Sequence, residues 1–421
     1  MTRRQKLSVS QDSEQWVDAD LLICPPEAIF DLAAFDETFQ QIVSQLREPN
    51  RQKTALVAEL HRFNQLGRDT LKSAFDVRPH DAHRLNKSYT YLTDCLIRFV
   101  WKTATDVLHK NASKTKAQQL SVLAVGGYGR GEMAPFSDVD LLFLTPIKLT
   151  PWSESVIESM LYMLWDLKFK VGHSSRTIKD CLRLGKEDFT IRTAMLEQRH
   201  VVGDKNLSTE LEKTLSENLF WGSEQEFIEA KLNEREARHQ KQGGQRYMVE
   251  PNVKEGKGGL RDLHSLFWIA KYVHRVKTIG ELVNLGLFTK EEYKIFQTAD
   301  TFLWAVRSHL HLIANRASDH LSFDLQVEVA TAMGYQDKSG RRAVEYFMQD
   351  YFRHATSVGD LTRIFLTFLE ASHTKPEPLL QRIFSKKPAI KPNYTVVHNR
   401  ISVRSTKDFL KDPLNLLRLF E

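Results

Sequence analysis

Residues 122–144 read VLAVGGYGRGEMAPFSDVDLLFL, which is an apolar run, a glycine-rich turn and a second apolar run that contains two aspartates. Short apolar runs bounded by glycine and proline are typical of buried strands. The stretch therefore predicts two strands joined by a turn that can lie close to a ligand.

The two aspartates are spaced so that they share one face of the second strand. Side chains two residues apart point the same way, so Asp138 and Asp140 present their carboxylates together. Two neighbouring anions repel each other unless a cation lies between them, and hard divalent cations prefer oxygen ligands. The pair therefore predicts a site for Mg²⁺ or Mn²⁺ with Asp138 and Asp140 as metal ligands and catalytic residues.

The glycine-rich turn predicts a phosphate-binding loop. Glycines at 126, 127 and 129 permit positive φ and close approach, so backbone amides can point at phosphate oxygens. Arg130 can add a charge-assisted hydrogen bond, and Ser137 precedes the first aspartate. These five residues are the predicted nucleotide-binding residues of the turn. The alternative is that Ser137 and Asp138 only form a hairpin turn.

Two other glycine-loop classes are excluded by their own spacing rules. A dinucleotide fingerprint runs from its glycines directly into a helix, whereas Pro135 and an acidic strand follow here. A P-loop needs Gly-Lys followed by Ser or Thr, and the candidate Gly256-Lys257 is followed by Gly258.

Together these motifs resemble the nucleotidyltransferase superfamily that includes DNA polymerase β, in which Gly-Gly or Gly-Ser precedes Asp-x-Asp on a strand. The chain is more closely similar to the bacterial protein-PII uridylyltransferase/uridylyl-removing family. That resemblance rests on GGYGRGEMAPFSDVDLLFL (126–144), LWDLKFKVGHSSRT (164–177) and EPNVKEGKGGLRDLHSLFWIAKYV (250–273), and it covers roughly residues 80–421.

The resemblance implies an α+β fold with a polymerase β-like core and mixed sheet, embedded in mostly helical flanking domains. It also implies transfer of UMP from UTP to a tyrosine hydroxyl of the signalling protein PII, by two-metal catalysis. Relatives usually add a third carboxylate on a later strand, for which Glu197 is the candidate. Asp166 and Asp188 compete for that role, and Glu197 could instead pair with Arg192 or Arg199 on a helix surface.

The segment from Pro251 to Tyr272 contains a second candidate site. Lys254, Lys257 and Arg261 surround three glycines just before an apolar helix that is predicted to begin near Leu260. A basic, glycine-rich helix entry can bind an anion through its amides and the helix dipole. These three basic residues are predicted to contact nucleotide, and the alternative is a solvated loop.

The composition limits the class of protein. A chain of 421 residues with 42% hydrophobic content can form two or three domains with real cores, and no apolar run is long enough to cross a bilayer. The basic N-terminus lacks an apolar signal region, so we expect a cytoplasmic protein with no membrane partner. The net charge of +6 is mild, and Lys231–Lys241 reads as a solvated mixed-charge helix face, so no nucleic-acid partner is predicted.

The pattern divides the chain into four regions. They are an N-terminal helical region (1–115), the nucleotidyltransferase core (116–205), a helical substrate-positioning domain (206–371) and a linker with a short hairpin (372–421). His309 and His311 in the third region diverge on a helix and are interpreted as packing or surface residues. Asp412-Pro413 begins a helix without an end, so the chain is predicted to be truncated.

Full-length relatives, as the resemblance implies, continue into an HD-type phosphohydrolase domain and two ACT domains. The sole His-Asp dipeptide here is His80-Asp81, which would need His61 and Asp94 to complete a metal set. Uridylyl-removing activity is therefore not expected in this chain. Two alternatives to the transferase stay open: a catalytically silent PII-binding module, and a nucleotidyltransferase that modifies RNA or adenylylates a protein.

Overall fold

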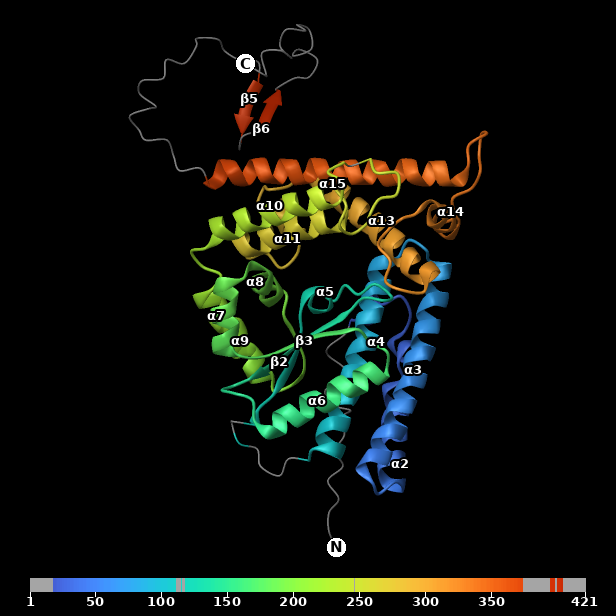
Figure 1. Cartoon of the computed structure of the whole chain (residues 1–421). Coiled ribbons are helices and arrows are strands. Elements are labelled where there is room, and N and C mark those ends of the chain that lie inside the picture. The colour runs from blue at the N-terminus through green and yellow to red at the C-terminus, as the bar shows by residue number, and fades with distance from the viewer. Residues whose placement is uncertain are drawn as a thin grey trace.

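The structure is a computed structural model of the chain, and it describes residues 18–110, 115, 118–245, 247–373, 394–397 and 400–403. Figure 1 shows a small sheet enclosed by helices, with a long C-terminal helix lying across one end of the molecule. The candidate site residues of the sequence all fall within the described part of the chain.

A four-stranded sheet with the order β3-β2-β1-β4 forms the centre of the core. Strand β1 pairs antiparallel with both β2 and β4, whereas β2 pairs parallel with β3. The sheet is therefore mixed, as predicted. Its strands are β1 (Ser121–Ala124), β2 (Val139–Thr145), β3 (Val171–Thr177) and β4 (Arg199–Gly203).

Both faces of the two central strands are buried, which explains their nearly continuous apolar sequence. Val122 and Phe143 belong to the main hydrophobic core, whereas Leu123 and Leu142 belong to a second cluster on the opposite face. Helix α6 (Pro151–Asp166) packs against the main core through Val156, Met160 and Leu164. Helix α9 (Lys205–Asn218) contributes Leu207, Leu211 and Leu215 to the second cluster.

The N-terminal region is helical, as predicted, and a long pair of helices runs beside the sheet (Figure 1). Aromatic side chains pack between this pair and the helix that precedes it, with the ring of Phe35 centred 4.4 Å from that of Phe99. The elements are η2 (Ala19–Leu21), α1 (Pro26–Ile29), α2 (Leu32–Gln45), α3 (Pro49–Val77), α4 (Ala82–Lys102) and the π-helical turn η3 (Thr103–Leu108).

Residues after the sheet form a second helical layer in which α10 and α11 lie between the sheet and α15 (Figure 1). Helix α11 begins at Leu260, as predicted. The remaining elements are α5 (Gly126–Gly129), α7 (Ile178–Glu187), α8 (Phe189–Leu196), α10 (Glu224–Lys241), α11 (Leu260–His274), α12 (Glu281–Asn284), α13 (Lys290–Ala314), α14 (Phe323–Ala332) and α15 (Ala343–His373).

The interpretation of Lys231–Lys241 as a solvated helix face is wrong for one side of α10. Lys231 and His239 are almost fully buried, and Arg238 forms an ion pair with the buried Asp262 of α11. Some charged side chains of α10 therefore form ion pairs inside the protein. The charge pattern of the sequence alone does not reveal this.

The predicted hairpin is confirmed: β5 (Tyr394–Val397) pairs antiparallel with β6 (Arg400–Val403). The predicted helix start at Asp412-Pro413 lies outside the described residues. Within the described ranges, no helix is both long and apolar enough to cross a membrane. The four predicted region boundaries stay predictions.

Candidate active site

The two predicted metal ligands lie at the start of the central strand β2. This strand begins at Val139, so Asp138 directly precedes it and is exposed, whereas Asp140 is half-buried within it. Asp140 pairs in register with Gly172 of β3, and its backbone carbonyl accepts a hydrogen bond of 3.1 Å from the Val125 amide. The sheet therefore fixes the backbone that carries the pair.

The charge of the pair is not neutralised by a contact. Burial raises the pKa of Asp140, and the negative charge of Asp138 raises it further. Lys254 opposes this shift from a distance. Among the described residues, neither carboxylate accepts a hydrogen bond or forms an ion pair.

Two glycines lie against the Asp140 carboxylate. A β-carbon on Gly172 would come within 2.3 Å of Asp140 Oδ1, and one on Gly126 within 3.3 Å of Oδ2. Gly126 also has a φ of 60°, a left-handed conformation that glycine adopts readily. The carboxylate therefore lies in a narrow space that larger residues would fill.

These observations fit a divalent cation. Two hard oxygen donors lie next to each other, repel each other and lack a protein counterion, which is the arrangement that Mg²⁺ or Mn²⁺ stabilises. The described residues contain no group of three or more His, Cys, Asp or Glu side chains arranged for a metal. A cation at this pair would therefore complete its coordination with water or with phosphate oxygens, as Mg²⁺ commonly does.

A buried polar network supports the glycine turn from beneath. Tyr128, in the middle of the turn, donates a hydrogen bond of 2.6 Å to Asp94 of α4. Arg199 of β4 binds the same carboxylate through two nitrogens, at 2.8 and 3.0 Å. Three elements are thus connected under the turn, and the sequence did not single out Tyr128 for this role.

Arg130 and Glu197 lie together as a buried ion pair. Arg130 Nη1 donates to Glu197 Oε2 at 2.6 Å, and Arg130 Nε donates to Glu132 at 2.7 Å. The second oxygen of Glu197 accepts a hydrogen bond from Trp268, and the Glu197 side chain is only 1% exposed. The geometry therefore favours a structural ion pair. It favours this over a role for Arg130 in binding phosphate and over a role for Glu197 as the third metal ligand.

The competitors for the third carboxylate are placed elsewhere. Asp188 caps the N-terminus of α8, where its carboxylate accepts hydrogen bonds from the amides of Thr190 and Ile191. Asp166 is exposed at the end of α6. The alternative pairing of Glu197 with Arg192 or Arg199 is also not observed, because those arginines contact the Gly185 carbonyl and Asp94.

Ser137 shapes the loop that leads into the aspartates. Its hydroxyl accepts a hydrogen bond of 2.9 Å from the Ala134 amide, and its own amide donates to the Ala134 carbonyl at 3.0 Å. Arg68 of α3 donates to the Pro135 carbonyl at 2.6 Å from one side. His311 of α13 accepts from the Phe136 amide at 3.3 Å from the other.

The second predicted segment contains a lysine whose charge affects Asp140. Lys254, which lowers the pKa of Asp140, lies half-buried before α11, together with Lys257. Arg261 pairs with Glu255 at 3.0 Å. Asp262 accepts a hydrogen bond of 2.8 Å from the Gly258 amide, so the buried carboxylate holds the glycine turn in place.

His264 is a further candidate site residue, and the sequence did not single it out. Its side chain is buried, and neither ring nitrogen has a hydrogen-bond partner among the described residues. Burial lowers its pKa well below the ordinary value, and the charges of Arg130 and Arg261 lower it further. A neutral imidazole therefore lies near Arg130 and Arg261, and its Nε2 lies 3.7 Å from the Glu132 carboxylate.

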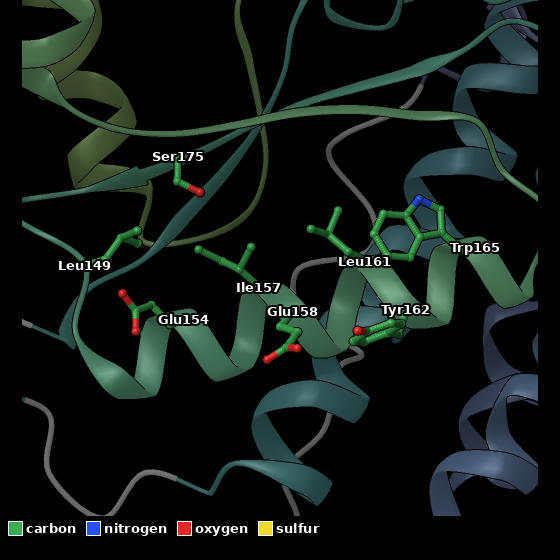
Figure 2. A pocket seen from close by; sticks show the side chains of 8 residues that line it. All are labelled: Leu149, Glu154, Ile157, Glu158, Leu161, Tyr162, Trp165 and Ser175. Atoms are coloured by element: carbon green, nitrogen blue, oxygen red, sulfur yellow. The ribbon is translucent and has the colours of Figure 1, made fainter.

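A surface groove lies away from these residues, between α6 and the edge strand β3 (Figure 2). It measures about 380 Å³, and Figure 2 shows acidic and aromatic side chains along it. Its lining residues are Leu149, Glu154, Ile157, Glu158, Leu161, Tyr162, Trp165 and Ser175. None of them is a predicted site residue.

Comparison with known proteins agrees with this architecture. Residues 226–366 match the family described as GlnD PII-uridylyltransferase, and residues 108–183 match the nucleotidyltransferase domain. The second match confirms the predicted fold class, in which the nucleotidyltransferase core contains the mixed sheet.

Two curated proteins are similar over almost the whole chain. The bifunctional uridylyltransferase/uridylyl-removing enzyme of Ruegeria pomeroyi is 57% identical over 393 residues, and that of Cereibacter sphaeroides is 54% identical over 402 residues. These matches cover 93% and 95% of this chain but 43% of each relative, so the chain spans less than half their length. The chain belongs to the family of bifunctional uridylyltransferase/uridylyl-removing enzymes.

Proposed function

We propose that this chain transfers UMP from UTP to a tyrosine hydroxyl of the PII signalling protein and releases pyrophosphate. The observation that carries the proposal is the pair Asp138 and Asp140, two adjacent carboxylates without a protein counterion beside a glycine turn. The acceptor protein and the uracil base of the nucleotide are inferred from the family, whose members are named as PII-uridylyltransferase and uridylyltransferase.

The carboxylates would hold Mg²⁺ or Mn²⁺, which when bound neutralises phosphate charge and acidifies an attacking hydroxyl. The residues themselves fix the geometry. Asp140 is held by the pairing of β2 with β3, and Asp138 projects from the loop in front of it. The acceptor hydroxyl then approaches the α-phosphorus from the side opposite the pyrophosphate, as in-line displacement requires.

The bond changes balance without any further reactant. A bond forms between the tyrosine oxygen and the α-phosphorus, and the bond from that phosphorus to the bridging oxygen of pyrophosphate breaks. The hydroxyl proton leaves to solvent, and pyrophosphate carries away the negative charge. Positioning and electrostatic stabilisation are the main contributions that a protein makes to such a transfer.

The basic segment before α11 is the proposed site of the β- and γ-phosphates. The charge of Lys254 lowers the pKa of Asp140, which supports placing this segment near a nucleotide held at the aspartates. Lys257 has no ion-pair partner in the described part of the chain, and Arg261 is shared with Glu255. Gly126, Gly127, Gly129 and Ser137 are proposed to line the α-phosphate.

The proposal does not include uridylyl removal, which is part of the relatives' printed name. The residues that could supply a His-Asp hydrolase set are not assembled. Asp94 is bound by Tyr128 and Arg199 in the buried network, and His61 is exposed on α3. Transfer alone is proposed for this chain.

The test is incubation of the chain with Mg²⁺ and α-labelled UTP or ATP, in the presence of PII or RNA. We expect label on PII from UTP, lost in Asp138→Asn and kept in Asp324→Asn, which changes an exposed aspartate on α14. Binding of PII without label transfer would instead support the silent module. Labelled RNA, or label from ATP, would support the other nucleotidyltransferase reactions.

A further inference from the structure

His311 and Asp319 form a polar contact between the helical region and the loop before the first aspartate. His311 lies on α13, its side chain is fully buried, and its Nδ1 accepts a hydrogen bond of 3.3 Å from the Phe136 amide. Its Nε2 lies 3.2 Å from Asp319 Oδ1. Phe136 is two residues before Asp138, so this contact acts on the backbone that leads into the site.

The protonation state of the histidine is consistent with both contacts. Burial lowers the pKa of His311 more than the hydrogen bond to Asp319 raises it, and the nearby charge of Arg307 lowers it further. A neutral imidazole has one N–H donor and one acceptor. Nε2 therefore donates to the Asp319 carboxylate, and Nδ1 is left to accept from the Phe136 amide.

Asp319 also forms an ion pair with Lys254, a positive residue of the site. Its Oδ1 accepts a hydrogen bond of 2.7 Å from Arg307 Nε, and its Oδ2 lies 3.9 Å from Lys254 Nζ. The backbone carbonyl of Asp319 accepts a hydrogen bond of 2.8 Å from the Val253 amide. One carboxylate thus contacts both the histidine that binds the loop before Asp138 and the lysine whose charge lowers the pKa of Asp140.

The loop is held from the opposite side as well. Arg68 of α3 donates to the Pro135 carbonyl, and its guanidinium lies 4.7 Å from the centre of the Phe136 ring. With Arg68 on one side and His311 on the other, the backbone from Pro135 to Phe136 has little freedom. Asp138 itself is exposed and has no contact in the described ranges that would orient it, so its position depends on this backbone.

We propose that His311 and Asp319 are positioning residues for the aspartate pair, so that the helical region sets the metal affinity of the nucleotidyltransferase core. The inference rests on the proposed function for its catalytic consequence. The contact between His311 and the Phe136 amide does not depend on the proposed function. Loss of the contact should let Asp138 move and weaken metal binding, while a saturating metal concentration restores turnover.

Two substitutions at His311 separate its two hydrogen bonds. An asparagine side chain places an oxygen near the position of Nδ1, so His311→Asn keeps the acceptor for Phe136. A glutamine side chain reaches the position of Nε2, so His311→Gln keeps the donor to Asp319 and loses that acceptor. The matched control is His309→Gln, because His309 is also buried on α13 but contacts the Pro79 carbonyl at 2.9 Å.

The first measurement is amide hydrogen exchange of a peptide that contains residues 134–138, in the absence of nucleotide. A hydrogen bond contributes about 1 kcal/mol, so we expect roughly fivefold faster exchange at Phe136 in His311→Gln. His311→Asn and His309→Gln should stay within about twofold of the wild type. Equal exchange in His311→Gln and His311→Asn, or unchanged exchange in His311→Gln, would overturn the inference.

The second measurement is the Mg²⁺ concentration at half-maximal label transfer. It should rise several-fold in His311→Gln, with kcat at saturating Mg²⁺ close to the wild type, and stay unchanged in His309→Gln. A fall in kcat with no change in Mg²⁺ dependence would contradict a positioning role.

If the wild type transfers no label, the proposed function fails, but exchange at Phe136 still decides the inference. If His311→Gln does not fold, Asp319→Asn replaces it in both measurements, with the same expected directions.

Discussion

At the scale of single residues, Asp140 and Glu197 show how surroundings assign different roles to two carboxylates. Asp140 is half-buried, has no side-chain partner in the described ranges and has a raised pKa, because burial and Asp138 oppose its charge. Glu197 is more deeply buried, but Arg130 and Trp268 each bind one of its oxygens. An unsatisfied carboxylate is the better candidate for binding a cation.

Substitution of Glu197 tests this distinction. We expect Glu197→Ala to lower the free energy of unfolding by about 3 kcal/mol, because Arg130 stays buried with only Glu132 as an anionic partner among the described residues. The Mg²⁺ dependence of transfer in the folded fraction should not change. A much higher Mg²⁺ requirement at wild-type stability, seen by denaturant unfolding together with metal titration, would restore Glu197 as the third metal ligand.

Gly172 provides a prediction about the space around Asp140. The β-carbon in Gly172→Ala would lie 2.3 Å from Asp140 Oδ1, so the carboxylate must turn away. We expect transfer to fall by about tenfold or more, since small misplacements of catalytic groups have large effects on rate. Stability should change little, because the atom in contact is the end of a side chain.

Ser175→Ala is the matched control for that substitution. Ser175 lies on the same strand but on its opposite face, in the groove of Figure 2. It should keep wild-type kcat/KM. Equal kcat/KM in Gly172→Ala and the wild type would show that Asp140 does not depend on this space.

At the scale of elements, the turn before α11 shows why glycine is needed at one position. Gly258 has a φ of 83°, and a β-carbon there would lie 2.3 Å from the Ala355 carbonyl oxygen of α15. The Gly258 amide also donates to Asp262, so the turn is fixed between two helices. This close approach positions the segment that contains Lys254 and Lys257.

Gly258→Ala should therefore destabilise the protein by more than the cost of placing an alanine at a positive φ. Gly334 has nearly the same φ, 82°, but no described atom lies within 4 Å of the place that a β-carbon would take there. We expect about 1 kcal/mol for Gly334→Ala and at least about 2 kcal/mol more for Gly258→Ala, measured by denaturant unfolding. Equal losses in the two variants would mean that the turn does not pack closely on α15.

The sequence was sufficient for features that depend on near neighbours. It predicted the strands on either side of the glycine-rich turn and the start of α11 at Leu260, because each follows from a local pattern. It did not predict the contact between Phe136 and His311, which are 175 residues apart. It also misassigned the buried side of α10, because periodicity does not say which charged face finds a partner.

At the scale of the whole molecule, Asp319 binds His311, which contacts the loop before Asp138 and so joins the helical region to the core. Burial opposes the charge of Asp319, but the hydrogen bond from His311 and the charge of Arg307 together lower its pKa well below the ordinary value. A carboxylate with a lowered pKa stabilises the folded state above its unfolded pKa of about 3.9, and this contribution is lost as the pH falls further.

The acid stability of the chain should therefore depend on Asp319. We expect the melting temperature of the wild type to fall more steeply below about pH 4 than that of Asp319→Asn, which lacks the titrating group. At pH 7 the variant should be the less stable of the two, because Arg307 loses its charged partner. Parallel pH profiles of the two proteins, followed by thermal denaturation, would remove Asp319 from this account.

The central claim, that Asp138 and Asp140 together hold a cation and its nucleotide, is tested most directly by Mn²⁺ binding measured by electron paramagnetic resonance. The wild type should bind Mn²⁺ in the presence of UTP, and Asp140→Asn should bind it at least about tenfold more weakly, as expected when one of two anionic ligands is lost. Asp324→Asn should bind it as the wild type does. Equal Mn²⁺ affinity in the wild type and Asp140→Asn would contradict the claim.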